Sequence, residues 1–493
     1  MSYSSTQINK RLKSLQQHLA DEHPDNPVLA KAVKSFRKMD YVGQSIGLLD
    51  KEESYATCVT WWPMIAVLGT FSAGKSTFIN SYLNLPLQRT GNHAVDDKFT
   101  VICYSRHNEA KTLPGVALDA DPRFPFFQIS RSIEEIAEAG QQRIDAYLQL
   151  KTCPSESIRG KILIDSPGFD ADEQRASTLR LTQHIINLSD LVLVFFDARH
   201  PEPKAMQDTL AYLVSASVDR ADVNKFLYIL NQMDVTAKED NPEEVVSAWQ
   251  RSLAEVGLIA GRFYRIYDPN SGVPIDDPQV KERYERKRRE DMADIDARIQ
   301  QIEIERSYRI VGKLEHTAKV LKDQVTNKLT TMLQRWKSRV ILVDSLVFST
   351  LAVLTGLALT LTHSWNSVKV LAAGIPTAET TSLVVLLLVL SSMGYIHFSI
   401  RRLVANKILR NLAKELGDNH DICKQYTGAF NKSTVAYRPM FFQNPAGWNE
   451  VTQQIIEEVV NEANDYIQAL NDQFTNPSGH NNKNGEDLPA QES

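Results

Sequence analysis

The stretch Gly69-Thr-Phe-Ser-Ala-Gly-Lys-Ser-Thr77 directly follows the apolar run Met64-Ile-Ala-Val-Leu68. It fits the pattern G-x-x-x-x-G-K-[ST], after an expected buried strand and before a helix expected to begin near Ser76. The two glycines let the backbone turn its N–H groups toward phosphate oxygens, and the helix N-terminus adds partial positive charge. These features predict a loop that binds a nucleoside triphosphate, and a chance match is the weaker interpretation because the flanking context also fits.

Residues of this loop have separate expected roles. Lys75 would reach the β- and γ-phosphates, and the Ser76 hydroxyl would ligate Mg2+. Ser72 is placed with Lys75 among the catalytic candidates. The nucleotide-binding candidates of the loop are Gly69, Ser72, Ala73, Gly74, Lys75, Ser76 and Thr77.

A second motif, Lys161-Ile-Leu-Ile-Asp-Ser-Pro-Gly168, ends another expected strand. Asp165 would hold Mg2+ through water, and the Gly168 N–H would contact the γ-phosphate, which makes Gly168 a third catalytic candidate. An Asp-x-Pro-Gly sequence alone is often only a turn. Its place after a phosphate loop favours the nucleotide-sensing interpretation.

The third motif, Phe226-Leu-Tyr-Ile-Leu-Asn-Gln-Met-Asp234, fits the base-reading pattern Asn-Lys-x-Asp at Asn231 and Asp234. Gln232 stands where the pattern has lysine, so base binding is favoured while guanine in particular has weaker support. Asn270, in the turn that follows the last expected strand, completes the nucleotide-binding candidates.

Apolar runs alternate with helical stretches from Trp62 to Pro269, which is typical of an α/β domain with a mainly parallel sheet. The expected strands are Met64–Leu68, Phe99–Tyr104, Lys161–Ile164, Leu191–Phe196, Phe226–Leu230 and Phe263–Tyr267. Helical periodicity precedes this domain, with Leu12, Leu15 and Leu19 on one face.

After the α/β domain, an apolar seam with steps of three or four residues predicts a helical bundle or coiled-coil stalk. Its members are Val311, Leu314, Ala318, Leu321, Val325, Leu329, Met332 and Trp336. The expected domains are N-terminal helices (1–60) that pack on the bundle, the α/β domain (61–275), a stalk (276–340), a membrane hairpin (341–402), a C-terminal helical segment (403–474) and a disordered tail (475–493).

Two uncharged segments, Ser345–Thr362 and Thr381–Ile400, approach the ~20 residues that span a membrane. Basic residues on both outer flanks predict a hairpin with both termini and the α/β domain in the cytoplasm. Two buried core helices are the alternative. Asp344, at the start of the first segment, is interpreted as a hydrated interfacial carboxylate.

Composition limits the other classes of function. The net charge of −5 gives no general attraction to nucleic acid, so no nucleic-acid partner is expected. The four cysteines show no metal-ligand spacing and are expected to be reduced thiols.

Taken together, the motifs resemble the dynamin superfamily, most closely its Eps15-homology-domain (EHD) ATPase branch. The resemblance is carried by Pro63-Met-Ile-Ala-Val-Leu-Gly-Thr-Phe-Ser-Ala-Gly-Lys-Ser-Thr-Phe-Ile79, by Phe195-Phe-Asp-Ala-Arg-His200 and by the stalk segment Ile304–Leu314. It covers roughly residues 25–325, while the hairpin is similar in placement to those of bacterial dynamin-like proteins and mitofusins. The similarity to the bacterial proteins implies a bacterial inner membrane as the expected location. It implies a dynamin-type G domain on a helical bundle, and nucleotide-driven remodelling of membranes by a homo-oligomer that assembles through the G domain and stalk.

The sequence departs from this family at two places. Val95-Asp96 stands where the first switch has a threonine that binds Mg2+, and Phe71 stands where dynamins have a catalytic glutamine. The leading hypothesis is a membrane-anchored GTPase that uses GTP and Mg2+, slow and stimulated by assembly or lipid. The alternatives are a non-enzymatic nucleotide-dependent switch or tether, and an EHD-like enzyme that uses ATP.

Overall fold

The computed structural model describes most of the chain, in two compact units. The residues described are 3–90, 98–124, 144–168, 176–199, 225–238, 241–255, 262–270, 272–362, 379–417 and 420–475. The α/β unit comprises Asn9–Val33, Ala56–Gly312 and Tyr466–Ser493, and the helical unit comprises Met1–Ile8, Lys34–Tyr55 and Lys313–Asp465.

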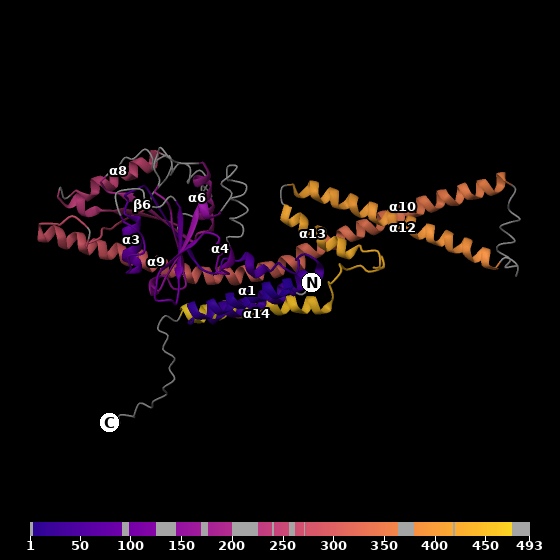
Figure 1. Cartoon of the computed structure of the whole chain (residues 1–493), viewed down its shortest axis with the longest axis horizontal. Helices are drawn as coiled ribbons and strands as arrows, with labels where there is room; N and C mark the ends of the chain where they lie inside the picture. Colours follow the sequence, from indigo (N-terminus) through magenta and orange to yellow (C-terminus); the bar gives the residue numbers. More distant parts are fainter. Residues whose placement is uncertain are drawn as a thin grey trace, which may run out of the picture. The chain divides into compact units, whose positions relative to one another are not determined.

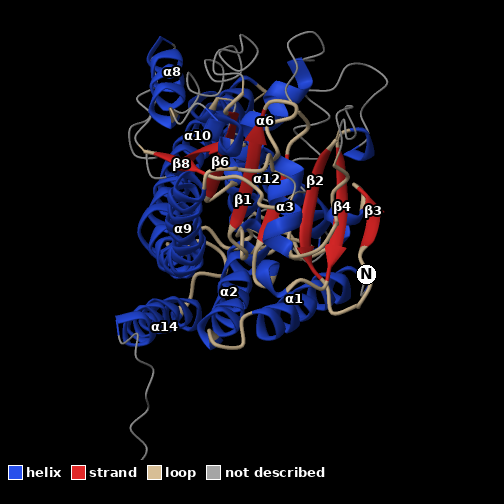
Figure 2. Ribbon diagram, turned by 90° about the vertical axis from the view of Figure 1, so that its left-hand side faces the viewer, coloured by secondary structure: helices blue, strands red, loops and turns tan. Residues whose placement is uncertain are grey.

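The α/β unit contains an eight-stranded sheet in the order β3-β4-β2-β5-β1-β6-β7-β8, with α3 in front of it in Figure 2. The strands are β1 (Met64–Gly69), β2 (Phe99–Tyr104), β3 (Lys111–Pro114), β4 (Leu148–Cys153), β5 (Ile162–Asp165), β6 (Leu191–Asp197), β7 (Phe226–Asn231) and β8 (Phe263–Arg265). β1 pairs in parallel with β5 and β6, and all its residues are buried. A near-continuous apolar run of this kind forms the centre of a parallel sheet covered on both faces.

The predicted α/β domain is confirmed, but the sheet is more mixed than expected. β3 and β4 were not predicted, and β2 runs antiparallel to β5. β4 contains Gln149 and Lys151, so its sequence lacks the apolar run by which strands were recognised. β3 is a four-residue strand with every residue exposed, which gives no hydrophobic pattern to detect.

Helices complete the α/β unit. They are α1 (Tyr3–Glu22, mostly in this unit), η1 (Tyr55–Cys58), α3 (Lys75–Leu83), α4 (Ala117–Ala120), η2 (Ile144–Ala146), η3 (Glu156–Ile158), α6 (Ala176–Leu188), η5 (Met233–Lys238), α8 (Pro242–Glu255) and α9 (Pro278–Lys319), which also enters the helical unit. Phe78 and Ile79 of α3 share a buried core with Ile295, Ile299 and Ile302 of α9. This core fixes the helix that follows the predicted phosphate loop.

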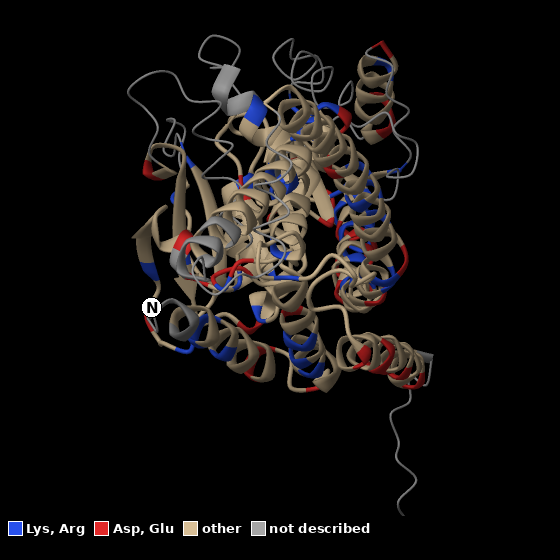
Figure 3. Ribbon diagram, turned by 90° about the vertical axis from the view of Figure 1, so that its right-hand side faces the viewer, with Lys and Arg blue, Asp and Glu red and all other residues tan. Residues whose placement is uncertain are grey.

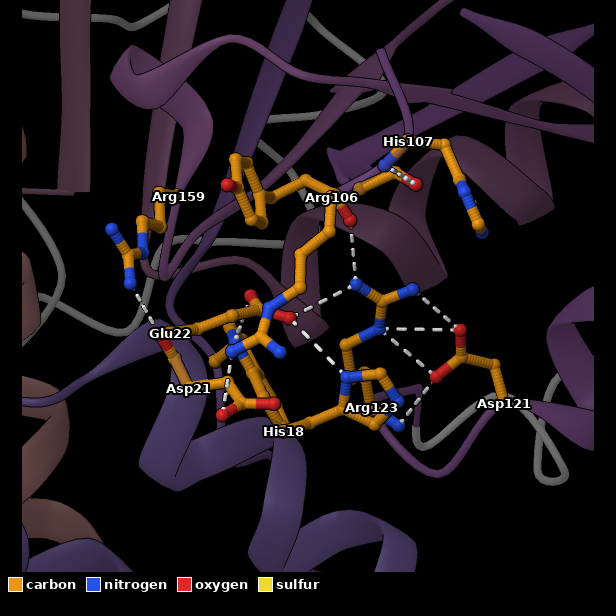
Figure 4. A network of polar contacts seen from close by, with 11 residues as sticks. His18, Asp21, Glu22, Arg106, His107, Asp121, Arg123 and Arg159 are labelled. Atoms are coloured by element: carbon orange, nitrogen blue, oxygen red, sulfur yellow. Dashed lines mark hydrogen bonds and ion pairs between the residues drawn. The ribbon is translucent and has the colours of Figure 1, made fainter. Parts of the chain in front are cut away.

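Buried charges hold the end of α1 at the N-terminal ends of β1 and β5 (Figure 4). Glu22 accepts hydrogen bonds from Trp62 Nε1 at 2.9 Å and from Arg123 at 3.1 Å. Arg123 also pairs with Asp121 at 2.7 Å. Glu22 and Arg123 are only 7% and 6% exposed, so the two charges neutralise each other inside the protein.

Asp190, just before β6, forms a second buried cluster at the same edge of the sheet. Its Oδ2 accepts from the backbone N–H of Met64 at 2.9 Å and from Arg306. Its Oδ1 accepts from Arg309 at 2.7 Å. The cluster therefore joins α9 to the start of β1.

The helical unit contains long helices. They are α2 (Pro27–Ile46, its first residues in the α/β unit), the π-helical segment η6 (Val320–Val325), α10 (Thr326–Leu361), α12 (Glu379–Leu416), α13 (His420–Ser433) and α14 (Glu450–Thr475, its last residues in the α/β unit). Acidic residues of α14 lie beside basic residues of α2 in Figure 3, and Lys38 pairs with both Glu458 and Glu462 at 2.7 Å.

The predicted apolar seam is buried except at Val325, where Thr326 is buried instead. The reason is the π-helical segment, which places one extra residue in this turn. The seam therefore steps from Leu321 to Thr326 and then continues at Leu329.

The described residues include one helix, Pro278–Leu361, long and apolar enough to cross a membrane, and its most apolar window is 6% buried. Exposed apolar residues at its end include Ile341, Leu342, Leu346, Leu351, Val353, Leu354, Leu357 and Leu361. The second predicted segment, Thr381–Ile400, lies in α12, and the loop between the two lies outside the described residues. The hairpin stays a prediction.

Candidate functional site

The predicted phosphate loop connects β1 to α3 at the C-terminal end of the central strand. Gly74 caps α3 with a φ of 82°, in the left-handed region that favours glycine. A Cβ atom on Gly74 would lie 2.2 Å from Asn231 Nδ2. Both backbone conformation and space therefore require glycine here, and the turn brings the loop against β7.

Lys75 is the first residue of α3, followed by Ser76 and Thr77. Its buried ammonium donates to the carbonyl oxygens of Gly69 at 2.8 Å and Thr70 at 3.0 Å. Burial lowers the pKa of Lys75 to about 8, although the charge of Asp165 acts in the opposite direction. The ammonium lies within the loop, where an anionic phosphate would favour its charged form.

The third sequence motif lies directly against the loop. Asn231 Nδ2 donates to the Ala73 carbonyl at 2.9 Å, and Gln232 Nε2 donates to the Ser72 carbonyl at 2.6 Å. Gln232 adopts a φ of 61°, which directs the chain out of β7 and into η5. The structure therefore brings together two motifs that lie far apart in the sequence.

Asp234 contacts the turn that contains Asn270. Its carboxylate is buried and accepts from the backbone N–H of Val273 at 2.5 Å. Asn270 is exposed, and its N–H donates to Asp268 Oδ1 at 3.1 Å. The structure thus places the base-reading candidates after β7 and β8 next to each other.

Asp165 ends β5, beside the strand that leads into the loop. Gln88 Nε2 donates to Asp165 Oδ2 at 2.7 Å, and Lys151 Nζ donates to Gln88 Oε1 at 2.5 Å. All three side chains are buried. Sequence reasoning missed Gln88 and Lys151, since neither belongs to a local motif and Lys151 lies in the unpredicted strand β4.

Two further segments reach the loop. A Cβ atom on Gly168 would lie 3.0 Å from Phe71 Cα, so the chain after β5 packs on the loop. Arg199, after β6, donates to the Ser72 carbonyl at 3.3 Å. Its hydrogen bond to Asp197 raises the pKa of the Arg199 guanidinium. The sequence predicted no role for Arg199, because the family segment matches the residues on either side of it and not Arg199 itself.

The expected Mg2+ ligands fit a metal that arrives with a nucleotide. Ser76 and Asp165 supply a hydroxyl and a carboxylate, the hard oxygen donors that Mg2+ binds together with phosphates and water. Within the residues described, no group of three or more His, Cys, Asp or Glu side chains is placed to hold a metal without a nucleotide.

Most of the expected first switch lies outside the described residues, since Val95 and Asp96 fall within 91–97. Of the two nearby threonines, Thr90 is exposed. Thr100 lies in β2 opposite Asp165, and its hydroxyl accepts from Gln149 at 2.7 Å.

Comparisons with known proteins agree with this geometry. A family model described as "Dynamin family" matches residues 65–233. The chain is 26% identical to EH domain-containing protein 2 of Rattus norvegicus over 181 residues, 35% of this chain and 30% of that relative. It is 28% identical to EH domain-containing protein 3 of Rattus norvegicus over 179 residues, 35% of this chain and 31% of that relative. The chain thus matches about a third of the length of these relatives.

Among solved structures, one described as "An oligomerised bacterial dynamin pair provides a mechanism for the long range sensing and tethering of membranes" is 14% identical. The comparison covers 97% of this chain and 79% of that chain, with a TM-score of 0.35. The family match spans the phosphate loop, Asp165 and Asn231, which are the elements that meet in the structure. Residues 65–233 therefore form a domain that matches the dynamin family, and the chain is similar to the EH domain-containing proteins over about a third of its length.

Proposed function

We propose that this protein is a membrane-anchored, dynamin-like GTPase that hydrolyses GTP to drive its own assembly and membrane remodelling, tethering or fusion. The observation that carries the proposal is the phosphate loop bonded to the Asn231–Gln232 segment. The long apolar helix that ends at Leu361 supports attachment to a membrane.

In this proposal each site residue acts on a part of the nucleotide. Lys75 and the loop N–H groups, including those near Ser72, stabilise charge on the transferring phosphoryl group. Ser76 and Asp165 hold Mg2+, which neutralises charge on the phosphate oxygens, while Gly168 contacts the γ-phosphate. The base lies between Asn231, Gln232 and Asp234 on one side and Asn270 on the other.

The proposed partners are a phospholipid membrane and further copies of this chain. The hairpin (341–402) crosses the membrane with both termini and the G domain in the cytoplasm, as the flanking basic residues indicate. Copies associate through the G domain and the helical stalk.

Two alternatives rest on specific residues. Val95-Asp96 in place of the switch threonine favours a nucleotide-dependent switch or tether with little turnover. Gln232 stands where the guanine-reading motif has lysine, which weakens the support for guanine and leaves an EHD-like ATPase as the second alternative.

The test is nucleotide turnover by the full chain, with and without liposomes. We expect liposome-stimulated GTP hydrolysis, and Lys75→Ala should reduce the rate about 100-fold or more because a charge-stabilising donor is lost. The matched control is Lys111→Ala, an exposed lysine in β3 that should leave the rate unchanged. Tight GTP binding without turnover would support the switch, and preference for ATP in competition would refute the guanine assignment.

A further inference from the structure

The connection between α13 and α14, residues 434–449, exposes three large aromatic side chains. Tyr437 is 88% exposed, Phe441 93% and Phe442 57%. Isolated exposed apolar residues are ordinary, but three rings within six residues of one connection indicate a surface that contacts something apolar. The residues that hold this connection in place indicate what that is.

The connection is attached to the two long helices beside it (Figure 1). Arg401 of α12 donates to the carbonyl oxygens of Ala436 at 3.2 Å, Val435 at 3.1 Å and Arg438 at 3.0 Å. Lys337 of α10 donates to the Phe442 carbonyl. Both attachment points lie at the ends of the apolar helix surfaces.

The positions of Arg401 and Lys337 along their helices determine the depth at which the connection would lie in a membrane. Arg401 directly follows the uncharged segment Thr381–Ile400. Lys337 precedes the exposed apolar residue Ile341 by four positions, about 6 Å at 1.5 Å per residue. The interfacial layer on each side of a bilayer is about 5–8 Å thick, so the connection lies at the level of lipid headgroups when these helices are in a membrane.

The apolar surface of α10 beyond this level carries one charged residue, Asp344. Its carboxylate lies 2.7 Å from His397 Nδ1 of α12 and is 16% exposed. The expectation that Asp344 is simply hydrated was therefore wrong, because a side chain of the neighbouring helix contacts it. The pairing leaves the surrounding helix surface apolar.

Positive charge accompanies the aromatic rings. The connection contains Arg438 and no carboxylate. Burial lowers the pKa of Lys337, and the positive charge of Arg438 lowers it further. Both cations donate to backbone carbonyl oxygens of the connection, Lys337 to Phe442 and Arg438 to Asn444. A bound anion would relieve this repulsion.

We propose that residues 434–449 form a second membrane contact, in which Tyr437, Phe441 and Phe442 insert among lipid headgroups while Arg438 and Lys337 bind the phosphates of anionic phospholipids. Aromatic rings favour the interfacial layer, and basic residues there are attracted to anionic lipid. The proposal rests on the proposed anchoring by the hairpin, which supplies the level of the membrane.

The experiment uses the full chain with Cys58 and Cys423 replaced by serine, since the other two cysteines are buried. Phe441→Cys carries an environment-sensitive fluorophore, and the protein is reconstituted into phosphatidylcholine vesicles with and without phosphatidylglycerol. We expect blue-shifted emission that headgroup spin-labelled lipid quenches, more strongly with phosphatidylglycerol. The control label at Asn464→Cys, on an exposed position of α14, should stay in water and unquenched.

Alkaline extraction of the same vesicles separates this proposal from anchoring by the hairpin. Protein that resists extraction while the Phe441→Cys label stays in water overturns the second contact and leaves anchoring intact. Extraction with a quenched label overturns the hairpin and supports the contact, and extraction with an aqueous label overturns both. A blue shift without quenching shows burial against protein and also overturns the proposal.

The role of the cations is tested with Arg438→Gln in the Phe441→Cys background. If Arg438 binds lipid phosphate, this change removes the extra quenching that phosphatidylglycerol produces. An unchanged preference for phosphatidylglycerol refutes that assignment.

Discussion

Both edges of the central sheet contain buried charged side chains, but these side chains have different kinds of partner at the two edges. At the N-terminal ends of the strands, Glu22 meets Arg123, and Asp190 meets two arginines. At the C-terminal ends, Lys75 donates to backbone carbonyls and Asp165 accepts from the amide of Gln88. Opposite charges are thus paired at the first edge, while neutral groups hold Lys75 and Asp165 at the second.

This difference separates structural from ligand-binding polar clusters. A paired buried charge has no remaining demand for a ligand, and its removal leaves a partner uncompensated. A cation held by carbonyl groups can exchange them for a stronger anionic partner. The first edge should therefore govern stability, and the second nucleotide binding.

The largest expected effect comes from Glu22→Ala. Arg123 would lose one carboxylate and Trp62 its acceptor, and breaking a buried pair in this way costs about 3–5 kcal/mol of unfolding free energy. Denaturant unfolding measures the loss, while nucleotide affinity of the folded protein should not change. Glu156→Ala, which breaks an exposed pair with Arg159, is the control and should cost less than about 1 kcal/mol. A similarly small loss for Glu22→Ala would remove the distinction between the edges.

A smaller effect is expected from the pH response of His23, which lies beside Glu22 and packs near Trp62. Burial lowers the pKa of His23 to about 4 from an ordinary 6.5, although Glu22 acts in the opposite direction. The unfolded chain therefore takes up a proton below pH 6.5 while the native protein does so only near pH 4. The free energy of unfolding is therefore not reduced by His23 above pH 6.5, and it falls as the pH decreases from 6.5 toward 4.

His23→Gln should remove about 3 kcal/mol of this acid-dependent loss. Urea unfolding at a series of pH values compares the variant with the natural chain. Parallel stability curves for the two proteins would show that another group carries the pH response.

The smallest effect is expected from Gln88→Leu, at the C-terminal ends of the strands. Asp165 would lose the amide that orients it, and the loss of such an outer contact weakens metal-dependent binding about tenfold. GTP affinity should fall by this factor with Mg2+ and stay unchanged with EDTA. The control is Gln149→Ala, which removes an amide that donates to Thr100 on the neighbouring strand. This variant should leave GTP affinity unchanged with Mg2+ and with EDTA. Equal losses with and without Mg2+ would show that Gln88 supports the loop in general.

The elements that sequence predicted are those with a local signal. β1 and β6 are continuous apolar runs, and the loop between Gly69 and Lys75 has fixed spacing. β4 interrupts its apolar residues with Gln149 and Lys151, whose burial depends on pairing with β2. No local pattern reports such pairing or its direction.

The candidate site divides in the same way. Lys75, Asp165 and Asn231 were expected from motifs, and the structure places Asn231 on the loop. Gln88 and Lys151 reach Asp165 through contacts between segments far apart in the sequence, so no motif identifies them. Arg199 lies in a segment that resembles the family, but the sequence predicted no role for it and did not indicate its contact with the Ser72 carbonyl.

The π-helical segment between Leu321 and Thr326 also affects how the protein tolerates changes in length. Deleting one residue from an ordinary α-helix rotates everything beyond it by about 100°, which moves a buried face toward solvent. Here the extra residue is already absorbed in a wider turn, so loss of one residue would restore a regular α-helix with Leu329 and Trp336 still on the buried face. Chain length is therefore less constrained at this turn than elsewhere in the long helix.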